Sequence, residues 1–575
     1  MKYTGARILI ESLIEEGVDT VFGYPGSAVL HIYDELYRQR DRIRHILVSH
    51  EQHAAHAADG YARSTGRPGV CIATSGPGAT NLLTGIAAAY MDSVPMVIIT
   101  GNVPTALLGK DSFQEVDIAG ASMPVVKHNW IVKNVDDLAP LIHEAFFVAS
   151  SGRKGPVLID IPKDITAIST DWKPREKTTP DQMPAGLSPP ARRLRERSRR
   201  QTFSDADIER AADILAKARR PLLYAGGGVI SAGADAELQS LAERLDAPVA
   251  LSLMGIGAMP HGHRLCTGLI GMHGTVASNK AAQKADLLVA IGARFSDRVV
   301  CRADMFAKTA RLLHFDIDPA EINKNIETNA WVLGDLKKTL GRLLEKLPAG
   351  VKGGWSNEIE RWKRQAPKTH SAGSSKKGLH PRFVIEESAK LLGPKTIAVT
   401  DVGQHQIWAA QFFPAESPRS FLSSGGLGSM GFGLGAALGA KIANPGRPVV
   451  LFTGDGCFKM NCGELATLKA CGIPVLILLF KNGVLGMVRQ WQSFFYEGRH
   501  SETDLNPYPD FVKLSAAYGI LGLRARSRSS FMKALKSAAG ELAAGRSCLI
   551  EAGIDPDEKV LPMVPSGRPI DEQIL

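Results

Sequence analysis

The stretch that decides the fold runs from Arg447 to Val488 and reads RPVVLFTGDGCFKMNCGELATLKACGIPVLILLFKNGVLGMV. Residues Val449 to Thr453 form a short apolar run with β-branched residues, which is typical of a buried strand in a parallel sheet. The run ends at Gly454-Asp455-Gly456, where two glycines allow a sharp turn and a close approach of the backbone to a ligand. The stretch therefore predicts a strand that delivers an aspartate to the edge of a sheet.

The residues after this turn predict a helix and a second strand. Asn461 and Glu464 have the spacing of a capping box, which predicts a helix from Cys462 to about Ala470. The next apolar run, Val475 to Phe480, reads as a buried strand, and Asn482 follows it. Strand, turn, helix and strand make a βαβ unit, whose two loops emerge together at the carboxyl edge of the sheet.

The side chains on these two loops suit a magnesium ion. Asp455 and Asn482 offer hard oxygen ligands, and Mg²⁺ in proteins keeps few protein ligands and takes the others from phosphate and water. A Gly-Asp-Gly alone could be an ordinary βαβ turn. Because the motif ends one apolar strand and an asparagine follows the next, the metal-binding interpretation is favoured.

Composition indicates a soluble globular protein of several domains. The chain has 575 residues, of which 44% are hydrophobic and 22% charged, so three domains are expected. No apolar run approaches a membrane span, and the N-terminus lacks the apolar core of a signal peptide. Seven cysteines in so long a chain do not form a disulfide framework, which predicts a reducing, cytoplasmic location.

Much of the net charge of +10 lies in one segment. Residues 191–200 read ARRLRERSRR and lie between prolines and a Thr/Ser-rich stretch. No aromatic residues interleave with the arginines, so the segment is interpreted as a solvated linker and no nucleic-acid partner is expected. Anionic cofactors are the simpler use for the remaining positive charge.

Repeated strand-turn-helix units predict doubly wound parallel sheets in three domains, at 1–165, 205–346 and 379–575. A basic linker at 166–204 and a Lys/Ser/Gly-rich linker at 347–378 would separate them. In the middle domain, the strand Pro221 to Ala225 ends in three glycines, a place where a dinucleotide could lie. The domain has no GxGxxG motif, so a purely structural role for it stays open.

Glu51 is the chemically interesting residue of the first domain. It follows the predicted strand His45 to Ser49 and precedes a helix of small residues, Ala54 to Arg63. A carboxylate in such an apolar setting would be desolvated, which would raise its pKa and suit it to proton exchange. The alternative is a helix-start glutamate that interacts with the helix dipole.

Taken together, these segments resemble the catalytic large subunit of acetohydroxyacid synthase (acetolactate synthase), a thiamine diphosphate enzyme, over nearly the whole chain. The Gly-Asp-Gly unit with its asparagine marks the thiamine diphosphate superfamily, while RQWQ and the C-terminal VLPMVPSG are specific to this family. The other matching segments include VFGYPG (21–26), HEQ (50–52), TSGPGATN (74–81), AYMDSVP (89–95), GMHG (271–274), DVGQHQIWAAQ (401–411) and GLGSMGFG (426–433).

The resemblance implies a pyrimidine-binding domain, a central FAD-binding domain and a diphosphate-binding domain, with thiamine diphosphate, Mg²⁺ and FAD as cofactors. The implied reaction decarboxylates pyruvate and condenses the hydroxyethyl fragment with a second pyruvate or with 2-oxobutanoate, the first common step of branched-chain amino-acid biosynthesis. The implied assembly is a homodimer or homotetramer, with a separate small regulatory subunit. Its active site would lie between two chains, with Glu51 of one facing Asp455 and Asn482 of the other.

The resemblance also implies roles for individual residues. Glu51 would favour the imino tautomer of the aminopyrimidine ring, Met430 would keep the cofactor bent, and Trp491 would contact the acceptor. The implied catalytic residues are Glu51, Gln114, Met430 and Trp491. The implied metal ligands are Asp455, Asn482 and the carbonyl of Val484. Around thiamine diphosphate the implied contacts are Gly403, Gln404, His405, Gly428, Gly454, Gly456, Cys457, Gly486 and Met487. Around FAD they are Arg153, Gly226, Gly227, Met272, His273, Gly274, Arg294, Arg298 and Asp316.

Some residues depart from the family pattern. His53 stands where the family commonly has glycine, near enough to Glu51 to touch the site, and Lys481 replaces the usual asparagine before the metal ligand. The other departures are Ser27, Ser296, Cys457 and Lys459. Two alternatives stay open beside the synthase: an FAD-dependent pyruvate oxidase, and an inactive member of the family that acts as a scaffold.

Overall fold

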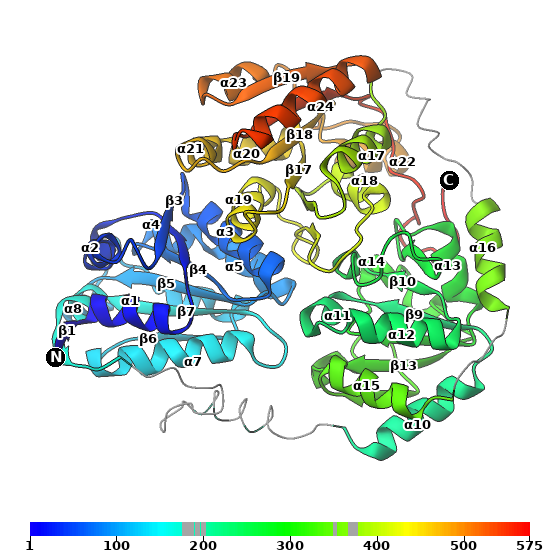
Figure 1. Cartoon of the computed structure of the whole chain (residues 1–575), viewed down its shortest axis with the longest axis horizontal. Coiled ribbons are helices and arrows are strands. Elements are labelled where there is room, and N and C mark those ends of the chain that lie inside the picture. The colour runs from blue at the N-terminus through cyan, green and yellow to red at the C-terminus, as the bar shows by residue number, and fades with distance from the viewer. Residues whose placement is uncertain (175–188, 190–191, 193–195, 197–202, 349–353, 366–377) are drawn as a thin grey trace.

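The chain folds around three six-stranded sheets in which all strand pairs are parallel. The computed structural model describes residues 1–174, 189, 192, 196, 203–348, 354–365 and 378–575. Figure 1 shows the N-terminal domain at the left, the central domain at the lower right and the C-terminal domain at the top. The expected fold class, three doubly wound parallel-sheet domains, is confirmed. Most of the basic segment 191–200 lies outside the described residues.

The N-terminal sheet begins with the expected strand-turn-helix units. Its strands, in spatial order, are β3 (Arg44–Leu47), β2 (Thr20–Gly23), β4 (Gly69–Ala73), β5 (Met96–Asn102), β7 (Pro156–Pro162) and β6 (His128–Ile131). Its covering helices include α1 (Gly5–Glu15), α3 (Glu51–Thr65), α5 (Leu83–Met91) and α7 (Leu138–Ser150). A small antiparallel pair of β1 (Lys2–Thr4) and β8 (Ser169–Asp171) ties residues beyond 165 to this domain.

The central sheet follows the same plan. Its strands, in spatial order, are β11 (Cys266–Leu269), β10 (Val249–Leu251), β9 (Pro221–Ala225), β12 (Leu287–Ile291), β13 (Arg311–Asp316) and β14 (Ala330–Leu333). Its helices include α10 (Asp205–Lys217), α12 (Asp235–Leu245), α13 (Val276–Lys284) and α15 (Leu336–Lys346). The range expected as a second linker holds helix α16 (Trp355–Gln365), whose Trp355, Ile359 and Trp362 pack on this domain.

The C-terminal sheet contains the stretch that decides the fold. Its strands, in spatial order, are β16 (Phe421–Leu422), β15 (Ile397–Thr400), β17 (Val449–Gly454), β18 (Leu476–Lys481), β20 (Cys548–Gly553) and β19 (Leu521–Ala525). Its helices include α17 (Pro381–Leu392), α18 (Gln404–Phe412), α19 (Gly433–Ala443), α20 (Asp455–Asn461), α21 (Leu465–Ala470), α22 (Gly486–Phe495), α23 (Phe511–Ala517) and α24 (Arg528–Ala543).

The predicted capping box at Asn461 is wrong. Helix α20 already begins at Asp455, and a 3₁₀ turn, η8 (Cys462–Glu464), separates it from α21. Asn461 instead donates from Nδ2 to Asp401 Oδ2 at 3.1 Å, because a buried carboxylate needs donors that water cannot supply. The Glu464 carboxylate accepts the backbone N–H of Ser49 in the N-terminal domain at 2.9 Å. Tertiary contacts have therefore replaced the local cap.

Helices α3 and α19 join the N-terminal and C-terminal domains, and they lie side by side in Figure 1. A methyl group on Gly60 would overlap the backbone of Ala436, and one on Gly439 would overlap the backbone of Ala57. The small residues thus let the two helix backbones approach closely, and their alanines enter one continuous apolar core. This contact fixes the helix that starts at Glu51 against the domain that carries Asp455.

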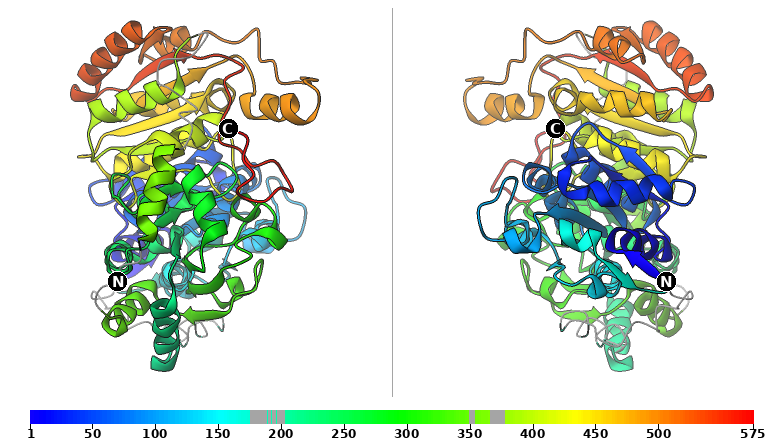
Figure 2. Two further views of the ribbon diagram at one scale, coloured as in Figure 1. Left: turned by 90° about the vertical axis from the view of Figure 1, so that its right-hand side faces the viewer. Right: turned by 90° about the vertical axis from the view of Figure 1, so that its left-hand side faces the viewer.

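The C-terminal segment crosses from the C-terminal domain to the central one, and Figure 2 shows it running along the surface. Gln490 is fully buried and exchanges two hydrogen bonds with Val560: it accepts that residue's N–H at 2.8 Å and donates to its carbonyl at 3.1 Å. Further on, the Val564 N–H donates to the Met272 carbonyl, and Asn279 donates to the Ile570 carbonyl. This segment therefore fixes the central domain to helix α22.

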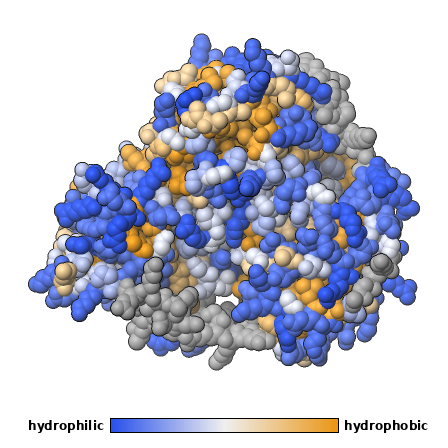
Figure 3. All heavy atoms as spheres, viewed as in Figure 1, coloured by the Kyte–Doolittle hydropathy of each residue, from blue (hydrophilic) through white to orange (hydrophobic). Residues whose placement is uncertain are grey.

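The surface of the molecule is uneven in polarity. In the view of Figure 3, hydrophilic residues cover the outer parts of the N-terminal and central domains, whereas apolar residues gather over the C-terminal domain. Within the described residues, no helix combines the length and apolar character that a bilayer crossing requires. All seven cysteines are free thiols.

Candidate functional site

Asp455 and Asn482 come together at the carboxyl edge of the C-terminal sheet. Strands β17 and β18 pair in register, so the loops that follow them are neighbours. The Asp455 Oδ2 accepts the N–H of Gly483 at 2.7 Å, and its Oδ1 accepts the N–H of Gly456 at 3.0 Å. Burial raises the pKa of the Asp455 carboxyl, although these N–H groups and the nearby Lys481 act in the opposite direction. A cation at this position would offset the burial of the carboxylate.

Three helices begin at the same edge: α18 at Gln404, α20 at Asp455 and α22 at Gly486. Their free N–H groups and aligned dipoles favour an anionic group there. The Asn482 side chain belongs to the same cluster, because its Oδ1 accepts the Val484 N–H at 3.1 Å. The donor set therefore fits a metal ion that bridges the protein to a phosphate-bearing ligand.

His405 supports this fit. A methyl group on Gly403 or Gly454 would crowd the Cε1 and Nδ1 atoms of the imidazole ring, so these glycines allow close packing. Burial lowers the pKa of His405 to about 3, so the ring is neutral near pH 7. Its buried Nε2 has no hydrogen-bond partner among the described residues. Since buried polar atoms are almost always paired, this nitrogen indicates a missing ligand group.

Gly486 provides a second close approach. A methyl group there would overlap Gln404 Oε1, a buried oxygen that also has no partner among the described residues. The other end of that side chain is held, since Gln404 Nε2 donates to Gln490 Oε1 at 3.0 Å. The side chain is therefore oriented, and its oxygen remains available to a donor.

Cys457 and Met430 border the same turn. The Cys457 Sγ donates to the Val402 carbonyl at 3.0 Å, and burial raises the pKa of this thiol well above its usual value. The Cys457 side chain thus already has a partner within the protein, which leaves its backbone to contact a ligand. The Met430 thioether lies close to Gly456, beside Leu485. Apolar side chains therefore lie next to the polar edge of the C-terminal sheet.

Glu51 lies at the edge of the N-terminal sheet, at the first residue of α3. Its Oε2 accepts a hydrogen bond from Asn81 Nδ2 at 3.0 Å, and Gly78 is close to Oε1. The backbone of Gln114, whose φ is +57°, lies close to Gly76, two residues before Gly78. The Glu51 side chain is half-buried in the single chain rather than enclosed, so the expected desolvation is incomplete here.

Within one chain, Glu51 does not meet Asp455. The start of α3 contacts η8, at the far end of α20: His53 Nδ1 lies 2.9 Å from Glu464 Oε1. Asp455 is at the opposite end of α20, about 10 Å away along the helix axis for seven residues at 1.5 Å each. No hydrogen bond links Glu51 to Asp455 or Asn482 in the part of the chain that the structure describes.

His53 pairs with Glu464 rather than with Glu51, which the sequence left open. Both side chains are buried, and Glu464 is fully enclosed. We expect His53→Ala to destabilise the fold by about 1–3 kcal/mol, because a buried carboxylate loses one of its partners. A melting temperature lowered by several degrees would be the result, with His31→Ala, at an exposed histidine, as the control. Equal melting temperatures for His53→Ala and the wild type would contradict this role.

A cavity of about 1080 Å³ lies between the three domains. It is larger than the usual pocket for a drug-sized ligand, so it suits a larger molecule such as a dinucleotide. Of the residues expected around FAD, Gly274 packs instead against Asn279 and does not line the cavity. The others line it: Arg153, Gly226, Gly227, Met272, His273, Arg294, Arg298 and Asp316. The cavity is also lined by Gly403, Gly428, Met487 and Trp491.

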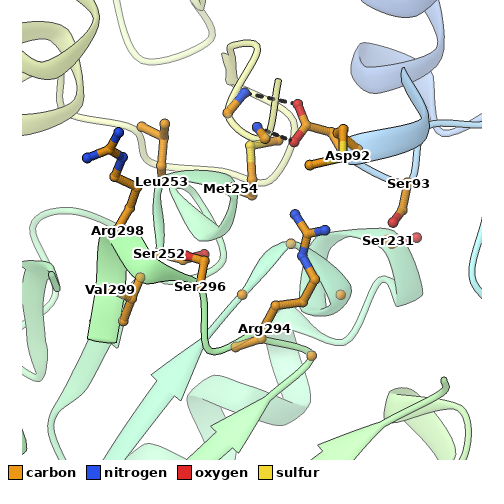
Figure 4. Close-up of a pocket in the computed structure, with 18 of the residues that line it drawn as sticks. Asp92, Ser93, Ser231, Ser252, Leu253, Met254, Arg294, Ser296, Arg298 and Val299 are labelled. Atoms are coloured by element: carbon orange, nitrogen blue, oxygen red, sulfur yellow. Dashed lines mark hydrogen bonds between the residues drawn. The ribbon is translucent and has the colours of Figure 1, made fainter. Parts of the chain in front are cut away.

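The charged groups of the cavity are partly paired. Arg153 reaches from the N-terminal domain to the central one, and its Nη1 lies 2.6 Å from Glu321 Oε1 and 3.2 Å from Asp318 Oδ2. Burial lowers the pKa of His273 to about 4, so this ring is neutral near pH 7. Arg298 Nη1 lies 3.6 Å from the Met272 sulfur, and Figure 4 shows Arg294 and Arg298 apart from each other on the stretch that follows β12. The cavity thus presents arginine donors beside glycine-rich loops.

Asp92 is a cavity residue to which the sequence gave no role. Its two carboxylate oxygens accept the N–H groups of Gly425 at 3.0 Å and Gly426 at 2.7 Å, as the dashed lines of Figure 4 show. Arg63 Nη2 donates to the same carboxylate at 2.9 Å. The only sequence signal was its place in AYMDSVP, because a lone aspartate after a helix carries no chemical pattern. It holds the glycine-rich turn that precedes Met430.

Trp491 projects from α22 toward the cavity. It lines that cavity with Met487 and packs edge-on against Phe495, with ring centroids 5.3 Å apart. Trp491 is only half-buried, so it is not a residue of the hydrophobic core. Gln490, next to it, anchors the helix to the C-terminal segment as described above.

Three family models match successive parts of the chain. Residues 3–121 match the N-terminal TPP binding domain of thiamine pyrophosphate enzymes, 208–343 their central domain and 401–552 their C-terminal TPP binding domain. Each range contains most strands of one of the three parallel sheets. The expected resemblance to thiamine diphosphate enzymes is confirmed.

The chain is also similar over its full length to individual proteins. It is 46% identical over 583 residues to an acetolactate synthase of Mycobacterium bovis, with 99% of this chain and 91% of that protein covered. It is 46% identical over 577 residues to the acetolactate synthase large subunit of Corynebacterium glutamicum, with 98% and 89% covered. It is 42% identical over 579 residues to the acetolactate synthase isozyme 3 large subunit of Escherichia coli, with 100% and 98% covered.

Proposed function

This chain belongs to the acetolactate synthase large subunits of the thiamine pyrophosphate enzymes, and we propose that it catalyses acetolactate synthesis from pyruvate. The observation that carries the proposal is the meeting of Asp455 and Asn482 at one sheet edge, within a chain similar to synthases from end to end. The proposed reaction decarboxylates one pyruvate and joins the two-carbon fragment to a second pyruvate or to 2-oxobutanoate.

The proposed cofactor site uses the polar edge of the C-terminal sheet. Asp455, Asn482 and the Val484 carbonyl would hold Mg²⁺, and the unpaired Nε2 of His405 and the N–H groups at the helix starts would face the diphosphate. Thiamine diphosphate, when bound, supplies a thiazolium carbon that becomes a nucleophile on deprotonation and an electron sink for decarboxylation. Met430 would pack against the bound cofactor and keep it bent.

Glu51 is the proposed proton-handling residue. Its carboxylate would hold a proton at the aminopyrimidine ring, and Asn81 keeps the carboxylate oriented through the 3.0 Å hydrogen bond. General acid–base groups of this kind contribute on the order of 10²–10⁴ in rate. Gln114, whose backbone lies close to Gly76, would contact the reacting groups.

FAD is proposed as the occupant of the cavity between the domains. Arg153 comes from the N-terminal domain, and Arg294 and Arg298 come from one stretch of the central domain. With the glycine-rich loop at Gly226 and Gly227, these arginines suit the charge and the close packing of a dinucleotide. Gly274 would act by shaping its loop rather than by contact. The flavin would play no net redox part in the proposed reaction.

A second copy of the chain is proposed to complete the active site, with its Glu51 facing Asp455 and Asn482 of the first. Apolar side chains next to the site residues support this: Phe113 is 88% exposed, Met460 57% and Tyr496 56%. Helix α22 stands out from the body of its domain in Figure 2. Exposed apolar groups around an incomplete site indicate an interface. A homotetramer, a regulatory subunit and a cytoplasmic location stay predictions.

Trp491 is proposed to select the acceptor, because its indole lines the cavity beside the cofactor edge. We expect Trp491→Leu to reduce the preference for 2-oxobutanoate over pyruvate by roughly tenfold or more, the value of one methyl group in an apolar pocket, while pyruvate decarboxylation persists. A competition assay with both substrates measures the ratio of the two products. Phe494→Leu, on the same helix but outside the cavity, is the control, and an unchanged ratio for Trp491→Leu would contradict the role.

Incubation of purified protein with pyruvate, thiamine diphosphate, Mg²⁺ and FAD tests the proposed function. Acetolactate should form without net reduction of the flavin. A pyruvate oxidase would reduce the flavin and form no acetolactate, and an inactive scaffold would release no CO₂. Either result would overturn the proposal.

A further inference from the structure

Lys481 is a largely buried lysine beside the proposed metal site. It ends β18, one residue before Asn482, and its side chain is 20% exposed. Its Nζ is enclosed and has no hydrogen-bond acceptor among the described residues. The nearest opposite charge is Asp455, whose Oδ2 lies 3.6 Å from Nζ. A buried ammonium in this situation calls for a reason, because desolvation of a charge is unfavourable.

Two aromatic rings hold the ammonium in place. The Lys481 Nζ lies 4.5 Å from the ring centroid of Tyr508 and 5.3 Å from that of Phe511. Phe511 is fully buried, so this part of the wall is fixed. Cation–π attraction at such distances is strongest where water is excluded. The rings and the carboxylate together determine where the charge sits.

The carboxylate facing Lys481 is the proposed metal ligand. Oδ2 of Asp455 already accepts the Gly483 N–H, so it is the oxygen that the backbone and the lysine share. Burial disfavours the charged form of this carboxyl, and the ammonium offsets part of that penalty. A divalent cation on the same carboxylate would be repelled by the ammonium, because two positive charges would stand within a few ångströms in a poorly solvated site.

We propose that Lys481 is a built-in counter-charge of Asp455, which stabilises the protein before a divalent cation binds and weakens the affinity for that cation. The proposal rests on the proposed function, in which Asp455 is a metal ligand. The asparagine that commonly precedes the metal ligand in the family carries no charge, so the lysine adds a full positive charge at this place. The expected result is a protein that needs more Mg²⁺ for loading than a chain with a neutral residue there.

Lys481→Met tests the proposal, because methionine keeps much of the length and the apolar contact and removes the charge. Mg²⁺ is titrated by calorimetry into protein with excess thiamine diphosphate, and melting temperatures are measured in chelator without either ligand. The dissociation constant for Mg²⁺ should fall by about tenfold or more, and the melting temperature in chelator should fall by a few degrees. Lys481→Asn should shift both values in the same directions, which keeps the test valid if one variant folds poorly.

Lys459→Met is the matched control. The Lys459 ammonium lies 5.4 Å from the same Tyr508 ring, but in the described structure it forms no ion pair with Asp455. Both measured values should stay at the wild-type level in this variant. A general effect of removing positive charge near the ring would instead appear in both lysine variants and would contradict a specific role of Lys481.

Asp455→Asn separates the two proposals. If Asp455 binds the metal, this variant loses measurable Mg²⁺ binding, and adding Lys481→Met to it no longer lowers the melting temperature. With that loss observed, an unchanged or weaker Mg²⁺ affinity in Lys481→Met overturns the role of the lysine alone. Normal Mg²⁺ binding in Asp455→Asn overturns the metal site and the lysine proposal together.

Discussion

Asp455→Ala is expected to abolish binding of Mg²⁺ and thiamine diphosphate at concentrations that saturate the wild type. The substitution removes the charged ligand at the carboxyl ends of β17 and β18, so the negative diphosphate would face the protein without its counter-ion. Acetolactate formation should fall to background. Cofactor binding is measured by titration of the protein in the presence and absence of Mg²⁺.

The fold has to be checked in this variant, because Asp455 also accepts two backbone N–H groups and faces Lys481. Far-UV circular dichroism should match that of the wild type. Glu541→Ala, which removes a partly exposed carboxylate of the same domain, should leave cofactor binding unchanged. Wild-type cofactor affinity in folded Asp455→Ala protein would refute the assignment of the metal site.

Glu51→Gln is expected to slow exchange of the cofactor C2 proton by on the order of a hundredfold or more, the scale of general acid–base catalysis. The amide keeps the volume and can still accept a hydrogen bond from Asn81, so cofactor binding should persist. It cannot hold and release a proton as a carboxyl group does. The exchange rate is followed by NMR after transfer into D₂O.

An Asn81→Ala variant complements this measurement. It leaves the Glu51 carboxylate in place and removes only its orienting donor, so exchange should slow by less than in Glu51→Gln. Exchange at the wild-type rate in Glu51→Gln would reduce Glu51 to a structural residue at the start of α3.

Much of the fold could be predicted from local patterns. The bounds of β9 agree with the predicted run, and those of β17 and β18 differ from theirs by at most one residue at either end, because each is a short apolar segment closed by glycine or a polar turn. Helix α16 lay in an expected linker, since the surrounding Lys, Ser and Gly masked an amphipathic pattern with Trp355 and Trp362 on one side. Long-range partners decided the remaining differences, as the pairing of Asn461 with Asp401 shows.

The candidate site was only partly predictable for the same reason. Asp455 and Asn482 could be placed together because parallel strands bring their following loops to one edge. The pairing of His53 with Glu464, the clamp of Asp92 on Gly425 and Gly426, and the approach of Lys481 to Asp455 join segments with no shared local pattern. No rule based on neighbouring residues reports such contacts.

In the proposed active site, Glu51 of one chain faces Asp455 of another. Acetolactate formation by a co-expressed pair of Glu51→Gln and Asp455→Ala chains, purified through two different tags, tests it most directly. In a mixed two-fold dimer one site would carry both substitutions and the other neither, so about half of the wild-type activity per dimer should return. Asp455→Ala alone should be inactive, and Glu51→Gln alone should be slower than the wild type by on the order of a hundredfold or more. Folded mixed dimers that bind cofactor through their Glu51→Gln chain but form no more acetolactate than the Glu51→Gln homodimer would contradict this arrangement.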